Sequence, residues 1–164
     1  MSPSQAAPLL VMIGLPGSGK STWAARFVSH SPGYRMIATD DVRAQLYGDA
    51  AVQGEWMSIW RVVLQQLQAS YRAIAQGQAA GVIYDATNVR RRHRREFIQA
   101  AQGLGFQPLT GIWVDTPLAV CLARNLRRSR QVPPEIIAKM SRQLTAAPPT
   151  VAEGLDRVNR VRFT

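Results

Sequence analysis

The sequence predicts a three-layer α/β sandwich, in which helices cover both faces of a central parallel sheet. Short apolar runs of the kind that form buried strands alternate with segments of helical periodicity along the chain, and this alternation is typical of parallel sheets. The chain also contains no internal repeat and no linker-like stretch. We therefore expect one domain over residues 1–164, with residues 1–7 as a loose N-terminal arm.

The first elements follow from apolar runs and from the residues that interrupt them. Residues 8–13 (PLLVMI) form a continuous apolar run that stops at a glycine loop, as a buried parallel strand does. Residues 20–30 are predicted to form a helix that ends at Ser-Pro-Gly. Residues 35–39 form a short second strand, and a short helix begins at Asp40 and Asp41.

A long helix is predicted over residues 55–76, because its apolar residues recur at steps of three and four positions. These residues are Trp56, Trp60, Val63, Leu67, Tyr71 and Ile74. The two tryptophans are interpreted as core or as the wall of a groove.

The remaining elements continue the alternation. Polar turns, glycines and prolines mark their ends. Residues 81–88 are expected to form a strand that runs into a polar turn. We expect further strands at residues 109–115 and 158–163, and helices at residues 90–105, 116–130 and 132–144.

The charge balance predicts a polyanionic partner. The chain has 20 basic and 10 acidic residues, a net charge of +10 and a pI near 11.2. A basic excess of this size concentrates phosphates and is typical of proteins that contact nucleic acid. The alternative is a general preference for arginine, since only Lys20 and Lys139 are lysines.

Cysteine content and hydropathy predict a cytoplasmic protein. Cys121 is the only cysteine, which excludes an intrachain disulfide and fits a reducing compartment. No apolar run approaches the ~20 residues that span a bilayer, and the N-terminus lacks the basic region of a signal peptide. We expect no membrane contact.

Residues 14–22 (GLPGSGKST) match the phosphate-binding P-loop, G-x-x-x-x-G-K-[ST]. Its glycines allow backbone N–H groups to surround a phosphate, and the following helix adds its N-terminal dipole. We expect Lys20 to bind the β- and γ-phosphates of ATP or GTP and Ser21 to hold Mg²⁺. The nucleotide-binding set is Gly14, Gly17, Ser18, Gly19, Lys20, Ser21 and Thr22.

Phosphoryl transfer also needs groups on the acceptor side, and two polar turns supply candidates. Asp40 or Asp41 follows the second strand and is placed to take the proton of an attacking hydroxyl; the alternative is helix capping. Arg43 lies within reach of an acceptor phosphate. In the turn at residues 85–88 (DATN), Asp85 is a candidate for orienting metal-bound water, and Thr87 or Asn88 for holding the acceptor; the alternative is an Asx turn.

Two arginine clusters complete the candidate residues. Arg124, Arg127, Arg128 and Arg130 crowd a helix end and a proline-bounded loop, and their spacing places several on one helical face. We interpret residues 124–145 as a lid that brings arginine to the transferring phosphoryl group; the alternative is a solvated helix end. The run RRRHRR, residues 90–95, is either an exposed helix face or a surface for phosphate backbones.

These motifs, in this order, resemble the P-loop 5′-hydroxyl polynucleotide kinase family from about residue 9 to 144. The resemblance rests on GLPGSGKSTWA, TDDVR, ATN before a basic helix, LARNLRRSR and VPPEIIAKM. It implies that Asp40 is the general base and that Arg43 binds an acceptor phosphate. It also places Thr87 near the acceptor and Arg124 and Arg128 in the lid.

One position departs from that family, since Ala86 stands where its D-T-N motif has aspartate, with Asp85 one residue earlier. The general plan is also similar to other small bacterial P-loop kinases, including zeta-toxin-like and antibiotic phosphotransferases. The predicted function is ATP- and Mg²⁺-dependent transfer to the 5′-hydroxyl end of a nucleic acid. The alternatives are a kinase of a small hydroxylated molecule (nucleoside, sugar or antibiotic) and a non-catalytic ATP-binding switch.

Overall fold

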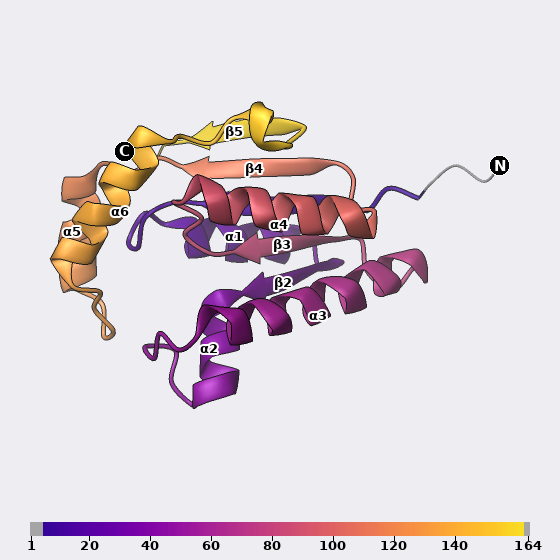
Figure 1. Cartoon of the computed structure of the whole chain (residues 1–164), viewed down its shortest axis with the longest axis horizontal. Coiled ribbons are helices and arrows are strands. Elements are labelled where there is room, and N and C mark those ends of the chain that lie inside the picture. Colours follow the sequence, from indigo (N-terminus) through magenta and orange to yellow (C-terminus); the bar gives the residue numbers. More distant parts are fainter. Residues whose placement is uncertain (1–4, 163–164) are drawn as a thin grey trace.

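The computed structural model describes residues 5–162, and its elements form a five-stranded parallel sheet between helices (Figure 1). In chain order they are β1 (Leu9–Ile13), α1 (Lys20–His30), β2 (Tyr34–Ala38), α2 (Thr39–Tyr47), α3 (Trp56–Ala75), β3 (Gly81–Asp85), α4 (Arg91–Leu104), β4 (Leu109–Val114), α5 (Leu118–Leu126), α6 (Pro134–Ala146), the 3₁₀ turn η1 (Val151–Glu153) and β5 (Arg157–Val161). The predicted α/β class and parallel sheet are confirmed.

The strand order β2-β3-β1-β4-β5 places β1 at the centre of the sheet. Its two neighbours are both parallel to it, with Leu10 opposite Ile83 on β3 and opposite Thr110 on β4. The loop that leaves β1 therefore emerges at the middle of the carboxyl edge, where ligands of open α/β sheets bind.

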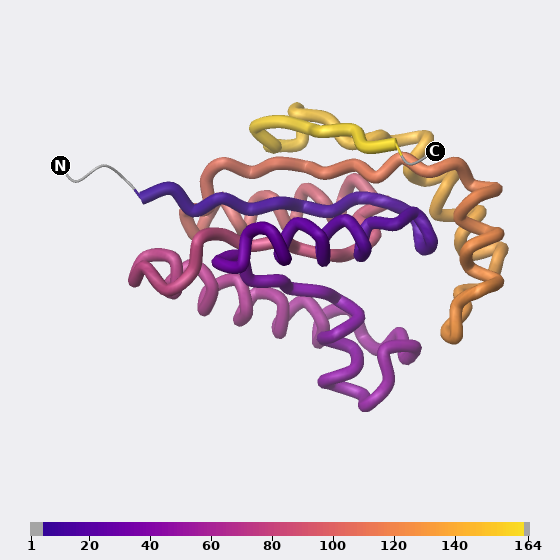
Figure 2. The backbone as a smooth tube through the Cα atoms, turned by 180° about the vertical axis from the view of Figure 1, so that it is seen from behind, coloured from indigo at the N-terminus to yellow at the C-terminus, as the bar shows by residue number. Residues whose placement is uncertain are grey.

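Apolar side chains on the two sides of the sheet pack into two separate clusters. Met12, Ile83 and Ile112 pack with Ala24 of α1, and α1 lies across this face when the molecule is seen from behind (Figure 2). The larger cluster, which includes Val11 and Tyr84, packs against α3 and α4 on the opposite face (Figure 1). Because successive side chains of a strand point to opposite faces of the sheet, each strand contributes apolar side chains to the core on both sides.

Helices α5 and α6 stand beside the carboxyl ends of the strands rather than over either face (Figure 1). They follow β4 and lead back through η1 to β5, which pairs with β4 in parallel register. The segment predicted as a lid is therefore next to the loop after β1. Within residues 5–162, none of the helices combines the length and apolar character needed to span a bilayer.

The third strand ends at Asp85, and residues 86–88 leave the sheet in the turn expected there. Two other sequence predictions need correction. The expected loose arm is not loose throughout: Ala7 is buried and exchanges two backbone hydrogen bonds of 2.9 Å with Gln107. Residues 1–4 lie outside the described part of the chain.

The second correction concerns the helix expected over residues 116–130, which ends at Leu126. The buried side chain of Asn125 stops it by folding the chain back. Its Nδ2 donates to the carbonyl of Val132 (2.7 Å), and its Oδ1 accepts from the N–H of the same residue (3.0 Å). Arg127, Arg128 and Arg130 therefore lie beyond the helix and do not share a helical face with Arg124.

Candidate active site

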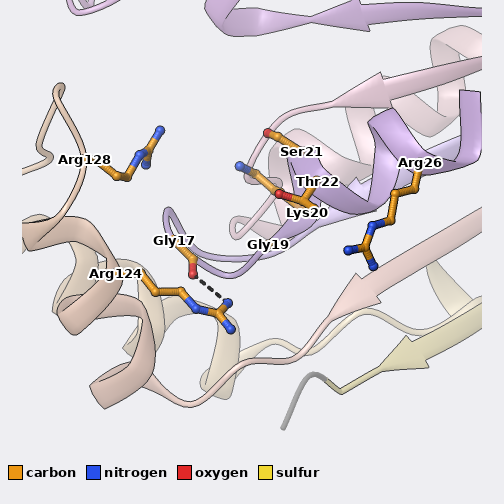
Figure 3. A pocket seen from close by; sticks show the side chains of 8 residues that line it. All are labelled: Gly17, Gly19, Lys20, Ser21, Thr22, Arg26, Arg124 and Arg128. Carbon is orange, nitrogen blue, oxygen red and sulfur yellow. Dashed lines mark hydrogen bonds between the residues drawn. The ribbon is translucent and has the colours of Figure 1, made fainter. Parts of the chain in front are cut away.

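Two cavities lie at the carboxyl edge of the sheet. The first, here called the loop cavity, has a volume of about 480 Å³ and surrounds the loop between β1 and α1 (Figure 3). It is lined by Gly17, Gly19, Lys20, Ser21, Thr22, Arg26, Arg124 and Arg128.

Glycine is required in this loop by backbone conformation and by close packing. Gly17 has a φ of 81°, and a Cβ atom there would lie 2.7 Å from the carbonyl oxygen of Cys121 on α5. Gly19 has a φ of 97° and immediately precedes α1. The loop can therefore curl tightly and approach α5 only without side chains at these positions.

The outer side of the loop is held by residues from the β4–α5 region. Thr116 Oγ1 donates to the carbonyl of Ser18 (2.7 Å), and Arg124 donates to the carbonyls of Gly17 and Ser18 (3.3 Å each). Because a trans peptide directs its carbonyl and N–H to opposite sides, the N–H of Gly19 points away from these partners. The loop thus offers an N–H group and the start of α1 to an anion in the cavity.

Two members of the predicted nucleotide-binding set support the loop from behind. Ser18 is fully buried. A Cβ atom on Gly14 would lie 2.7 Å from the Ser18 hydroxyl, and the N–H of Gly14 donates to the carbonyl of Thr87 (3.0 Å). The other five predicted residues, Gly17, Gly19, Lys20, Ser21 and Thr22, line the cavity itself.

Ser21 and Asp85 are hydrogen-bonded to each other and present oxygen atoms of the kind that bind Mg²⁺. The Ser21 hydroxyl donates to Oδ2 of Asp85 (2.9 Å), and Lys20 Nζ lies 4.0 Å from Oδ1. Among the described residues this buried Oδ1 has no hydrogen-bond partner. A hydroxyl beside a carboxylate oxygen that lacks a hydrogen-bond partner fits Mg²⁺. This ion takes few protein ligands and completes its coordination shell with water and substrate phosphate. No group of three or more His, Cys, Asp or Glu side chains within residues 5–162 is placed to hold a metal.

The second cavity, here called the aromatic cavity, has a volume of about 570 Å³ and lies beside the first. Asp40 projects into it from the first turn of α2. Its Oδ1 accepts from Arg43 (3.2 Å) and from Arg130 (3.3 Å), and the side chain is half exposed. No side chain caps α2, so the capping role considered for Asp40 is not observed. Asp41 is exposed.

Burial excludes Tyr84 as a base in this cavity. It raises the pKa of the tyrosine hydroxyl well above the usual range, so that the group stays protonated at neutral pH. The side chain of Asp40, in contrast, is half exposed.

The turn after β3 is built mainly by interactions with distant segments. Asn88 has a φ of 50°, and its amide donates 2.7 Å to the carbonyl of Met12 on β1. The amide nitrogen of Asn88 is therefore engaged by the fold, although Asn88 and Thr87, the candidates for acceptor contacts, both line the aromatic cavity.

Arg94 fixes the same turn from inside the protein. It is fully buried, forms an ion pair of 2.6 Å with Glu153 and donates to the carbonyls of Asn88 and Val89. The run at residues 90–95 is therefore neither a uniform exposed face nor a uniform phosphate surface. Arg94 belongs to the core face of α4, together with Phe97.

The two cavities share three residues. Lys20, Ser21 and Arg128 line both of them. Figure 3 shows the side chain of Arg128 directed from the loop after α5 toward the P-loop. The two cavities therefore adjoin at a lysine, a hydroxyl and an arginine.

The sequence interpretation missed several residues of the aromatic cavity, and it left open whether Trp56 and Trp60 face a ligand. Both tryptophans line this cavity, together with His93 and Lys139. Helical spacing placed the tryptophans on the packed face of α3, but no local pattern indicates where that face ends and the cavity begins.

Comparisons with known proteins agree with this geometry. The family model of the AAA domain (AAA_33) matches residues 9–147. The chain is 25% identical over 136 residues to the L-seryl-tRNA(Sec) kinase of Methanococcus maripaludis. The aligned residues make up 80% of this chain and 50% of that protein. The chain thus spans about half the length of this curated relative.

Solved structures share the fold at low sequence identity. A chain of the Pnkp1/Rnl/Hen1 RNA repair complex has a TM-score of 0.69 and 21% identity, over 88% of this chain and 46% of that one. A sugar kinase from Janibacter has a TM-score of 0.61 and 18% identity, over 95% and 85%. The tunicamycin resistance protein of Deinococcus radiodurans has a TM-score of 0.58 and 19% identity, over 93% and 86%.

The sheet order, the phosphate loop on the central strand and the arginine segment beside it are the architecture of P-loop kinases. The family match extends over most of the chain. We conclude that the chain has the fold of P-loop kinases and belongs to the AAA domain family AAA_33.

Proposed function

We propose that this protein is an ATP- and Mg²⁺-dependent kinase that phosphorylates the 5′-hydroxyl end of a polynucleotide. The observation that carries the proposal is the junction of the two cavities at Lys20, Ser21 and Arg128. A donor phosphate in the loop cavity and a hydroxyl in the aromatic cavity would meet at that junction.

On the donor side, the proposed roles follow from the contacts of the loop. Lys20 and the N-terminus of α1 bind the β- and γ-phosphates, and Ser21 with Asp85 holds Mg²⁺, which neutralises phosphate charge when bound. Arg124 keeps the loop in place from behind, and Arg128 reaches the transferring group.

On the acceptor side, Asp40 accepts the proton of the attacking hydroxyl. The hydroxyl oxygen forms a bond to the γ-phosphorus, the bond to the β-phosphate oxygen breaks, and ADP leaves. Arg43 and Arg130 keep the carboxylate oriented while it waits for the acceptor. Arg43 also carries a buried Nε without a hydrogen-bond partner among the described residues, which leaves a donor for an acceptor phosphate.

The charges of the aromatic cavity favour a polyanionic acceptor. Six cationic side chains and three acidic ones line it: Lys20, Arg43, Arg90, Arg128, Arg130 and Lys139, against Asp40, Asp85 and Glu96. The whole chain carries a net charge of +10. A surplus of positive charge around a phosphoryl-transfer site attracts an acceptor that already carries phosphates. The similarity to a chain of an RNA repair complex and to a tRNA-directed kinase points in the same direction.

A small hydroxylated acceptor is the second candidate. The aromatic cavity, at about 570 Å³, has the size of an ordinary small-molecule pocket. A sugar kinase and an antibiotic-resistance protein also share the fold. Such an acceptor would use the same Asp40 but would leave most of the positive charge without a partner.

Label transfer from γ-labelled ATP distinguishes the two candidates. The acceptors are a short single strand with a 5′-hydroxyl, the same strand with a 5′-phosphate, free nucleosides and simple sugars, each with and without Mg²⁺. Lys20→Ala serves as the blank. We expect labelling of the 5′-hydroxyl strand only, with Mg²⁺ present. Labelling of nucleosides or sugars alone would refute the polynucleotide assignment.

Salt dependence gives an independent reading. Binding of a single strand through Z phosphate contacts weakens with a slope of about −0.7Z in log K against log salt. We expect a steep slope for the strand. A flat slope would assign the acceptor to the small-molecule class.

A further inference from the structure

Three aromatic rings form a ladder on the wall of the aromatic cavity. Trp56 lies 5.1 Å from His93, measured between ring centroids, with an interplanar angle of 12°. Trp60 lies 6.2 Å from Trp56 at 18°. The three rings are therefore close to parallel although they come from two helices, α3 and α4. We call them the aromatic ladder.

The ladder is supported from the core and open toward the cavity. Trp60 meets the buried ring of Phe97 edge-on at 6.3 Å, and Phe97 stacks on Tyr84 at 3.9 Å. In contrast to these two buried rings, Trp56, Trp60 and His93 are each only partly buried, and all three line the cavity. Core packing alone does not account for ring surface that remains open to a cavity beside Asp40.

The chemistry of the ladder suits a flat, uncharged ring. Near-parallel aromatic planes stack on other π systems, and this contact is tolerant of base identity because every nucleobase has a π face. Burial, with help from Arg90, lowers the pKa of His93, so that its imidazole is neutral at neutral pH. Polar groups beside the rings, Gln53 and Glu96, can meet the edge of a base.

We propose that the aromatic ladder of Trp56, Trp60 and His93 is a nucleobase subsite, which stacks the base of the acceptor's 5′-terminal nucleotide while its 5′-hydroxyl lies at Asp40. This inference rests on the proposed function and adds a substrate determinant to it. The subsite would recognise that the terminal nucleotide carries a base, but it would not distinguish one base from another.

The first test compares two acceptors that differ only in one base. One is a short single strand with an ordinary 5′-terminal nucleotide, and the other carries an abasic residue at that position with its 5′-hydroxyl intact. We expect the intact protein to phosphorylate the abasic end with a kcat/KM lower by about 5- to 150-fold, mainly through KM. Equal kcat/KM values for the two ends would overturn the proposal.

Variants at one position separate stacking from packing. Trp56→Leu removes the ring and keeps an apolar side chain, whereas Trp56→Phe keeps a smaller ring. Trp56→Leu should lose most of the preference for the base-bearing end, so that the kcat/KM values for the two ends converge. Trp56→Phe should retain much of the preference. A uniform loss on both acceptors in Trp56→Leu would show a merely structural role and would refute the subsite.

A binding measurement keeps this inference separate from the proposed function. The 5′-hydroxyl strand, added without ATP, should quench the indole fluorescence of the intact protein, and less so in Trp56→Phe. Trp23→Phe is the control, because Trp23 stacks on Phe27 in the other core cluster, and it should leave the quenching unchanged. Failure of transfer with quenching intact would refute the kinase assignment alone. Quenching by sugars but not by the strand would refute the ladder as a base site.

Discussion

The loop cavity and the aromatic cavity differ in how far apart in the sequence their residues lie. Five of the eight residues of the loop cavity fall between Gly17 and Thr22. The aromatic cavity draws on α2, α3, the turn after β3, α4, the loop after α5 and α6. A phosphate site can be built from one turn of chain because backbone N–H groups do most of the binding. An acceptor site needs side chains converging from several directions.

This difference explains why nucleotide use can be read from a short motif and acceptor identity cannot. It also implies that changes at the junction should affect every acceptor, whereas changes in the aromatic cavity should depend on the acceptor used. The following predictions test that division, and three of them compare neighbouring residues of the same type.

The largest effect is expected for Arg128→Ala. Arg128 lines both cavities, and an arginine over the transferring phosphoryl group contributes on the order of 10³–10⁵ in rate. We expect kcat to fall by at least ~10³-fold with every acceptor. Arg127→Ala is the matched control, since Arg127 is exposed at the end of α5. Similar losses in both variants would contradict the assignment.

Asp40→Asn should follow, with a loss of about 10²–10⁴-fold in kcat, the usual contribution of general-base catalysis. The KM for ATP should remain unchanged, because Asp40 lies in the aromatic cavity and not around the P-loop. The exposed neighbour Asp41→Asn should behave as the intact protein. Full end-phosphorylation by Asp40→Asn would rule out the mechanism.

Arg94→Met should destabilise the protein by about 3–5 kcal/mol, because it removes the buried partner of the Glu153 carboxylate and leaves only the half-exposed Arg91, at 3.4 Å, to pair with it. Thermal unfolding measures this. Arg95→Met, on the exposed side of the same helix, should cause little change. The double variant Arg94→Met with Glu153→Leu should recover part of the loss. Equal melting temperatures for Arg94→Met and Arg95→Met would be incompatible with the buried pair.

Asn125→Ala should have a smaller effect, about 1–3 kcal/mol in stability and roughly tenfold in transfer rate, because both halves of its amide bind Val132. The rate should fall with all acceptors alike, since Arg128 lies in the loop that Asn125 closes. Ser129→Ala, exposed in that loop, is the control. Steady-state transfer with two different acceptors checks whether the loss is uniform.

The smallest effect is a dependence of stability on pH through His93. Burial lowers its pKa in the folded state relative to the unfolded chain, so the unfolded chain binds more protons between the two values. Stability should therefore fall as the pH drops from about 6.5 toward the lowered pKa. His93→Gln should show a weaker dependence over that interval in chemical denaturation at several pH values. The same pH dependence of stability in the intact protein and in His93→Gln would contradict this role of His93.

The order and type of the elements were predictable because the local sequence signals agree with the elements that the chain forms. The helix over residues 20–30 begins and ends where its glycine and Ser-Pro-Gly signals indicate. Two failures have physical causes. The end of α5 is set by a side chain that bonds seven residues onward. Arg94 looked like its neighbours, although it shares the helical face of Phe97, Ile98 and Ala101, and this spacing was a usable signal.

The candidate site likewise contains residues that local motifs indicate and contacts that only the tertiary structure determines. The motifs indicated Asp40, Arg43 and Asp85 because Asp85 ends a strand at the carboxyl edge, and Asp40 and Arg43 lie in the helix that begins directly after another such strand. The ladder and the pairing of Arg130 with Asp40 were not predictable. The contact between Trp56 and His93 joins residues 37 positions apart and that between Asp40 and Arg130 joins residues 90 apart, and only tertiary packing sets such contacts.

The amide pair between Asn125 and Val132 has a consequence for the thermodynamics of substrate binding. Ordering a residue's backbone costs about 1–2 kcal/mol of conformational entropy, and a free six-residue arginine loop would oppose nucleotide binding by several times that amount. Because the pair already closes the loop, most of this entropy is lost when the chain folds. Nucleotide affinity at this site should therefore carry a smaller unfavourable entropy than it would with an open loop, and calorimetry of the intact protein against Asn125→Ala would measure the difference.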